Sequence, residues 1–392
     1  MKIFLYKNAS LSLALLLIIL LMPACTINPQ KMTAVEYPAE MFNLLSGRAL
    51  IGHEIKQDEL PNINLLAITP EMARFAEQAV TNKADLFDKV KALHMALLKP
   101  IAQGGREITY SAFTTETPIK TFNDRKANCL SFTLLYVALA RHLGIDAHVN
   151  EVVVPPKWDM RETGQLYYMQ HVNVKISLRN DRSMQHIGSF SLIPDQAIID
   201  LAMSFYRPTY PQKTITDELA AAKFYSNRGM EFSAAGNYRD AFLYLRKALQ
   251  INNQQSYIWN NFGSLYRRNE LLQATEIIYL HGLKLNPDDL TIMNNLSGIY
   301  QKTGDTSQAT LFYNLATRHR QANPYYQYIL AHSAFDSGDY AKALMYVKRA
   351  IDREKTEPRF YQLTARIYEQ LGEPKQVEIM TKKYKSLSAA TH

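Results

Sequence analysis

Residues 127–144 read ANCLSFTLLYVALARHLG, a run that is apolar on nearly every side and stops at Gly144. Such a run is typical of a buried helix, and glycine commonly ends one. Asn128 is a favoured N-cap residue, so Cys129 is predicted to lie in the first turn. There the unpaired backbone amides and the positive end of the helix dipole stabilise a thiolate and can hold an oxyanion.

Short strands are predicted downstream of this helix. In the middle one, Val172 and Val174 alternate with polar residues, which places His171 on the opposite face. Upstream, the apolar spacing of residues 85–98 predicts another helix. Helices mixed with short strands indicate an α+β domain over residues 60–212. The expected strands cover residues 145–154, 170–178 and 196–201.

Cysteine at a buried helix start, followed by histidine and aspartate on successive strands, resembles the order found in the papain-like transglutaminase superfamily. The similarity is carried by ANCLSFT at 127–133 and LGIDAH at 143–148, and it extends over residues 60–200. It implies a transglutaminase-like fold and thiol-dependent acyl transfer, which ends in hydrolysis by a protease or amidase, or in cross-linking to an amine.

The resemblance implies a catalytic triad of Cys129, His171 and an aspartate. Asp200 is preferred because it lies within the predicted strand that pairs beside the histidine strand; Asp195, just before that strand, is the alternative. The Cys129 thiolate would attack a carbonyl carbon, and His171 would take and return the proton. The aspartate would fix the tautomer of His171 and stabilise its cation.

The C-terminal half repeats itself every 34 residues, and each unit carries a small residue at the same position. Small residues allow paired helices to approach closely, as in the tetratricopeptide repeat, which this pattern resembles. An all-α solenoid is therefore expected over residues 222–391, with units starting near 222, 256, 290, 324 and 358. The recurring small residues are Gly229, Gly263, Ser297, Ala331 and Ala365.

The first helices of these units also carry polar and aromatic residues suited to a peptide ligand. Asparagine amides can donate to and accept from a peptide backbone, and tyrosine offers rigid contact area. Alternatively, the asparagines hydrogen-bond between neighbouring helices. The predicted groove residues are Asn227, Asn261, Asn295, Tyr257, Arg267 and Tyr328.

The N-terminus predicts export. Lys2 and Lys7 precede an apolar run over residues 13–22, which has the length of a signal-peptide core. The run ends at Ala24-Cys25, which resembles a bacterial lipobox and implies cleavage after residue 24 and acylation of Cys25. The resemblance places the protein at the outer membrane, facing the periplasm. The alternative is an ordinary signal peptide or anchor with an incidental cysteine.

Composition is that of a soluble globular protein with enough residues for two domains, and residues 25–59 are predicted to be a tether and N-terminal extension. The 392 residues are 47% hydrophobic, which excludes a disordered chain. The net charge of +8 is dispersed and does not suggest a nucleic-acid partner. Two cysteines exclude a disulfide framework and a tetrahedral thiolate zinc site. No cofactor motif or metal motif is found.

Two functions remain open from the sequence. The first is a membrane-anchored periplasmic acyl-transfer enzyme whose repeats hold a protein or peptide substrate. The second is an adaptor, in which the transglutaminase-like domain is catalytically inert and the repeats scaffold an envelope complex. An activated thiolate at Cys129 distinguishes them, because a buried structural cysteine does not alkylate readily.

Overall fold

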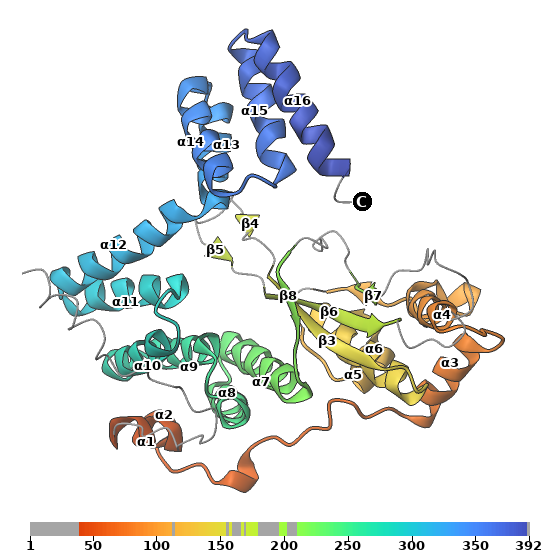
Figure 1. The fold of residues 1–392 in the computed structure, drawn as a ribbon. Coiled ribbons are helices and arrows are strands. Elements are labelled where there is room, and N and C mark those ends of the chain that lie inside the picture. The colour runs from red at the N-terminus through yellow and green to blue at the C-terminus, as the bar shows by residue number, and fades with distance from the viewer. Residues whose placement is uncertain are drawn as a thin grey trace, which may run out of the picture. The chain divides into compact units, whose positions relative to one another are not determined.

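The computed structural model places an α+β domain before a run of paired helices, which confirms the predicted fold class (Figure 1). Cys25 and Asp195 lie outside the residues that the structure describes, as does the predicted signal peptide. The described residues are 39–111, 114–153, 157–158, 166–167, 170–178, 196–201 and 210–389.

A four-stranded antiparallel sheet forms the centre of the N-terminal domain, with strand order β7-β6-β3-β8. β6 is an inner strand, and Val152 of β3 pairs with His171 of β6. The sequence predicted β3, β6 and β7 to within two residues at their ends, but it did not predict β8. The strands are β3 Ala147–Val153, β6 Gln170–Ser177, β7 Gln196–Ile199 and β8 Gln212–Thr214. Two-stranded pairs are formed by β1 Thr109–Tyr110 with β2 Lys126–Ala127 and by β4 Lys157–Trp158 with β5 Leu166–Tyr167.

Helix α6, Cys129–His142, packs beside this sheet (Figure 1). Its residues from Leu130 to Ala140 are all buried, as the apolar run predicted. Burying a Leu or Phe side chain contributes about 1.5–3 kcal/mol, so α6 anchors the domain. The other elements before the repeats are α1 Ala39–Ser46, α2 Arg48–Ile51, η1 Gln57–Glu59, α3 Pro70–Val80, α4 Leu86–Leu98, η2 Ile101–Gln103 and α5 Pro118–Asp124.

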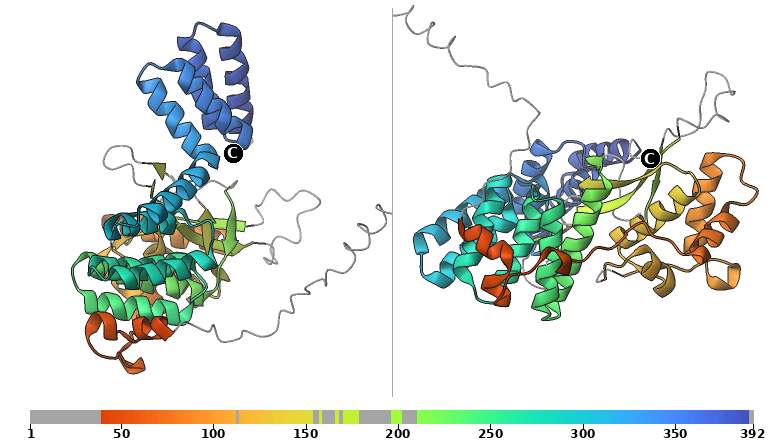
Figure 2. Two further views of the ribbon diagram at one scale, coloured as in Figure 1. Left: turned by 90° about the vertical axis from the view of Figure 1, so that its left-hand side faces the viewer. Right: turned by 90° about the horizontal axis from the view of Figure 1, so that it is seen from below.

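Five helix pairs form the repeat array within the described residues (Figures 1 and 2). The first helices of the later four pairs begin at residues 256, 290, 324 and 358, which are the predicted starts. The first pair begins earlier than expected, at Asp217. The pairs are α7 Asp217–Ala234 with α8 Tyr238–Ile251, α9 Ser256–Arg268 with α10 Leu272–Leu285, α11 Leu290–Thr303 with α12 Thr306–Ala322, α13 Pro324–Asp336 with α14 Tyr340–Arg353, and α15 Pro358–Gln370 with α16 Pro374–Ala389.

Small residues lie where paired helices touch. A Cβ on Gly229 would stand 2.6 Å from Leu245 Cγ, and one on Gly263 would stand 2.6 Å from the Tyr279 ring. Such distances are too short for carbon atoms in contact, so larger side chains would force the helices apart. The recurrence every 34 residues therefore reflects helix packing.

The segment before the α+β domain lies against the first repeats. Tyr266 donates its hydroxyl hydrogen to Leu44 O at 2.7 Å, and Arg246 Nε donates to Leu45 O at 2.9 Å. The φ of Gly47 is +89°, and a Cβ there would stand 2.9 Å from Ile55 Cγ1. Residues 44–47 are thus held in place rather than acting as a free tether.

We expect Gly263→Ala to lower the free energy of unfolding by about 1–3 kcal/mol, because the added methyl group overpacks against the buried Tyr279 ring. Gly298→Ala is the matched control, since its Cβ would meet no atom within 4 Å. That variant should be about 1 kcal/mol more stable through helix propensity alone. Urea denaturation measures both, and equal stabilities of the two variants would contradict the packing argument.

Candidate active site

Cys129 is the first residue of α6, as the sequence predicted. The Asn128 side chain caps the helix by accepting from Ser131 N at 2.8 Å. The first-turn amides of Cys129 and Leu130 have no acceptor further back in the helix, so they are available to an anion. Cys129 is partly buried and is not in a disulfide. The thiol is therefore placed at the positive end of the α6 dipole, which favours a negative charge.

His171 and Asp200 form the second part of the site. His171 lies on inner strand β6 and is 1% exposed, while Asp200 directly follows β7 and is 3% exposed. His171 Nε2 and Asp200 Oδ2 are 2.5 Å apart. Because Asp200 occupies Nε2, Nδ1 is the ring nitrogen that can exchange a proton with the thiol.

The environment of His171 favours its cation. Burial alone would lower the pKa of His171, but hydrogen bonds to Asp200 and Cys129, together with their negative charges, raise it to about 9. Titratable groups with strongly shifted pKa values concentrate at functional sites. The structure thus brings the three predicted triad residues together, with the imidazole between the carboxylate and the thiol.

A row of buried amides extends from the carboxylate across the sheet. Asn173 Nδ2 donates to Asp200 Oδ2 at 3.3 Å, and Asn150 Nδ2 donates to Asn173 Oδ1 at 2.8 Å and to Gln212 Oε1 at 2.9 Å. Buried polar groups need such partners, and here the partners also orient Asp200. Sequence reasoning gave these amides no role. Asn173 could have been noticed because it lies two residues after His171 on the same strand face.

Three further residues lie within electrostatic range of the site, and sequence reasoning missed all of them. The pKa of Tyr110 is raised by burial and by the charges of Cys129 and Asp200, so its hydroxyl stays protonated. Burial lowers the pKa of His94, and the charge of Asp200 opposes that shift. Burial likewise lowers the pKa of Lys223, while Glu151 and Cys129 favour its cation. Lys223 could have been recognised from the sequence, because it is the one charged residue in the otherwise apolar run 219–225.

The predicted groove residues are spread over four helices of the array, α7, α9, α11 and α13. Asn261 Nδ2 donates to Ser226 Oγ on the preceding first helix at 2.9 Å, and Asn295 Nδ2 donates to Asn260 Oδ1 at 2.8 Å. These two amides therefore join neighbouring helices, which is the alternative role. Asn227 is exposed. Binding of a peptide by this set stays a prediction.

The aromatic and cationic members of that set have different surroundings. The Lys223 ammonium lies 4.7 Å from the centroid of the Tyr257 ring. Tyr328 packs on Phe360 with ring centroids 5.1 Å apart, while Arg267 is exposed. Only part of the predicted set is thus open to solvent.

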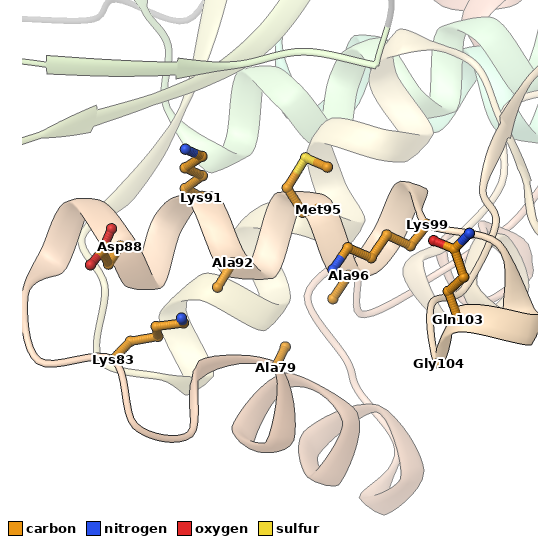
Figure 3. Close-up of a pocket in the computed structure, with 10 residues that line it drawn as sticks. All are labelled: Ala79, Lys83, Asp88, Lys91, Ala92, Met95, Ala96, Lys99, Gln103 and Gly104. Carbon is orange, nitrogen blue, oxygen red and sulfur yellow. The ribbon is translucent and has the colours of Figure 1, made fainter.

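A cavity of about 390 Å³ lies between α3 and α4, and its lining residues all precede Cys129 in the sequence (Figure 3). Its lining includes three alanines, three lysines and one aspartate. The lining does not include Cys129, His171 or Asp200. The charged lining residues are Lys83, Asp88, Lys91 and Lys99.

Neither a metal centre nor a membrane span is found in the part of the chain that the structure describes. There, no group of three or more His, Cys, Asp or Glu side chains is arranged to hold a metal ion. None of the described helices combines the length and apolarity needed to cross a bilayer.

Several solved structures are similar to part of this chain. MamA from Desulfovibrio magneticus RS-1 is 16% identical, covers 45% of this chain and 97% of its own, and gives a TM-score of 0.25. The structure titled "Functional Characterization of Pseudomonas Aeruginosa pilF" is 15% identical over 43% of this chain and 82% of its own, with a TM-score of 0.25. YrrB, described as "a TPR protein with an unusual peptide-binding site", is 13% identical over 42% and 86%, with a TM-score of 0.24.

No curated protein matches the chain. Family profiles match two regions of it. The profile described as "Tetratricopeptide repeat" matches residues 222–255, the first predicted unit. The profile described as "Transglutaminase-like superfamily" matches residues 73–186, which include Cys129 and His171. The chain thus consists of a transglutaminase-like domain followed by tetratricopeptide repeats.

Proposed function

We propose that this protein is a thiol-dependent acyl-transfer enzyme acting on a protein or peptide held by its repeats. The observation that carries the proposal is the buried His171–Asp200 pair beside the partly exposed Cys129 thiol. Burying a charged pair costs desolvation energy, so such a pair adds little to the free energy of unfolding. A chemical role for the histidine explains both its burial with a carboxylate and its position beside the thiol.

The geometry supports a two-step reaction. The Cys129 thiolate bonds to the carbonyl carbon of an amide or ester, and the backbone amides of the first turn of α6 receive the developing oxyanion. His171 passes its proton to the leaving group, which departs and leaves a thioester on Cys129. Water or an amine then attacks the thioester while His171 takes the proton back. Asp200 holds the imidazole orientation through both steps.

The first test is the reactivity of the thiol toward iodoacetamide at pH 7. In the native protein Cys129 should alkylate faster than free cysteine, because His171 favours its thiolate. His171→Ala should slow the reaction by about tenfold or more, because it removes the cation that pairs with the thiolate. Asp200→Asn should change alkylation less, but it should strongly reduce acylation of Cys129 by p-nitrophenyl acetate, because it disturbs the tautomer of His171.

A Cys129 that alkylates only after denaturation would overturn the enzyme proposal. The adaptor function would then replace it, since the repeats would remain. Cys129→Ala is the control for labelling at any other site. Mass spectrometry of the labelled peptide reports which cysteine reacted.

The histidine charge gives a pH-dependent test. The pKa of His171 is raised in the folded protein from its ordinary value of 6.5 to about 9. Its contribution to the free energy of unfolding should therefore be fully present below pH 6.5 and be lost as pH rises through 9. We expect an imidazole NMR signal that titrates near pH 9 and disappears in His171→Gln.

Asp200→Asn should move this titration to lower pH, because the carboxylate gives the largest upward contribution to the pKa of His171. A titration near pH 6.5 in both proteins would show that the imidazole does not share a site with the carboxylate and thiolate. Denaturation with urea across the same pH range provides the independent stability profile.

We also propose that the chain is exported and lipid-anchored through Cys25 at the outer membrane, facing the periplasm. The apolar run over residues 13–22 and Ala24-Cys25 support this. Cys25→Ala should abolish incorporation of labelled fatty acid and yield a soluble or uncleaved product. Retained lipid labelling in this variant would exclude Cys25 as the attachment site, and Cys129→Ala serves as the matched cysteine control.

A further inference from the structure

The first repeat helix, α7, contacts the N-terminus of α6 through a chain of hydrogen bonds. Glu231 Oε1 of α7 accepts from Thr115 N at 2.7 Å. Thr115 Oγ1 accepts from Asn128 Nδ2 at 2.8 Å, and Asn128 is the residue that caps α6 immediately before Cys129. A carboxylate on the repeat array is therefore linked to the cap of the thiol-bearing helix through one intervening residue, Thr115.

A second arm closes this chain into a ring. Ser131 Oγ donates to Asn128 Oδ1 at 2.9 Å and accepts from Glu116 N at 2.8 Å. The Glu116 carboxylate lies 3.7 Å from Arg228 Nη1, which also lies 2.8 Å from Glu231 Oε2. The ring thus begins and ends on α7 and passes through the first turn of α6.

The ring is largely shielded from water. Thr115 is 1% exposed, Asn128 8% and Ser131 0%. Side-chain hydrogen bonds in such surroundings are stronger than in water, and leaving one partner unsatisfied is costly. Thr115, Asn128 and Ser131 are consequently held in one geometry, which in turn fixes the start of α6.

Helix α7 is also attached to the sheet that carries the histidine. Lys223 Nζ of α7 pairs with Glu151 Oε1 of β3 at 2.5 Å, and the two side chains are only 7% and 14% exposed. Glu151 stands opposite Val172 in the register of β3 with β6, next to His171. One helix of the array is therefore joined both to the element that bears Cys129 and to the strand pair that bears His171.

We propose that α7 is a positioning element of the thiol site, with Glu231 and Arg228 aligning Cys129 against His171 through Thr115 and Asn128. This inference rests on the proposed thiol chemistry and assigns no contact with substrate to either residue. In this proposal the repeat array helps to set the reactivity of the Cys129 thiol, in addition to any role in holding a partner.

The test compares alkylation of Cys129 by iodoacetamide in three variants of the whole mature protein. Glu231→Ala removes both bonds of the carboxylate and should slow alkylation about tenfold, the scale of one lost charge-assisted hydrogen bond. Glu231→Gln keeps an oxygen that can accept from Thr115 N, so its rate should recover to within about threefold of the native rate. Glu218→Ala is the matched control, because Glu218 is exposed on the same helix and should leave the rate unchanged.

A double-mutant cycle separates alignment from general loosening of the structure. If Glu231 acts through the thiol–imidazole pair, Glu231→Ala should add little to the effect of His171→Gln. A purely structural role would instead change the rate equally in both backgrounds. Should Glu231→Ala fail to fold, Thr115→Val breaks the same link to Asn128 while conserving side-chain shape, and it should slow alkylation similarly.

The outcomes distinguish this inference from the function on which it rests. If native Cys129 is unreactive, the enzyme proposal itself fails. If native Cys129 is reactive but Glu231→Ala matches Glu218→Ala, the positioning role of α7 is overturned while the enzyme proposal stands.

Discussion

The hydrogen bond between His171 Nε2 and Asp200 Oδ2 is the interaction on which the arrangement of the site depends. Both groups are almost fully removed from water, so each needs the other to offset the cost of burial. This requirement is met by the strand order, which sets β7 directly beside β6. It is reinforced by the amide row of Asn173 and Asn150, which lies beside it on the same face of the sheet. The same bond leaves Nδ1 of His171 to serve the thiol.

Features encoded locally were predictable from the sequence. Asn128 and Gly144 bracket α6 as expected, because capping depends on a few neighbouring residues. The repeat starts at 256 and 290 followed from small residues that packing demands in every unit. The proximity of His171 and Asp200 was expected only through a family resemblance, since residues 29 positions apart are joined here by strand register.

What the sequence did not reveal depends on contacts between distant segments. Glu231 and Thr115 are 116 positions apart, and no sequence motif around either residue indicates that the two are in contact. The amides of Asn150 and Asn173 look like ordinary strand residues until the register of β3 with β6 is known. Helix α7 starts early, at Asp217, because Thr216 caps it by accepting from Leu219 N at 3.2 Å. Asp217 also pairs with Arg141 at the end of α6, at 2.5 Å. That ion pair lies outside the repeat pattern, so periodicity could not indicate it.

The strand order also decides which part of the site is held least firmly. His171 lies on β6, whose backbone bonds to strands on both sides, whereas Asp200 follows a four-residue strand at the sheet edge. Edge segments open in local fluctuations that leave the rest of a domain intact, and their amide hydrogens exchange with solvent sooner. Fraying of β7 would carry the carboxylate away while the cysteine and histidine stay in place. When this edge strand opens, the site loses its acid and keeps its nucleophile.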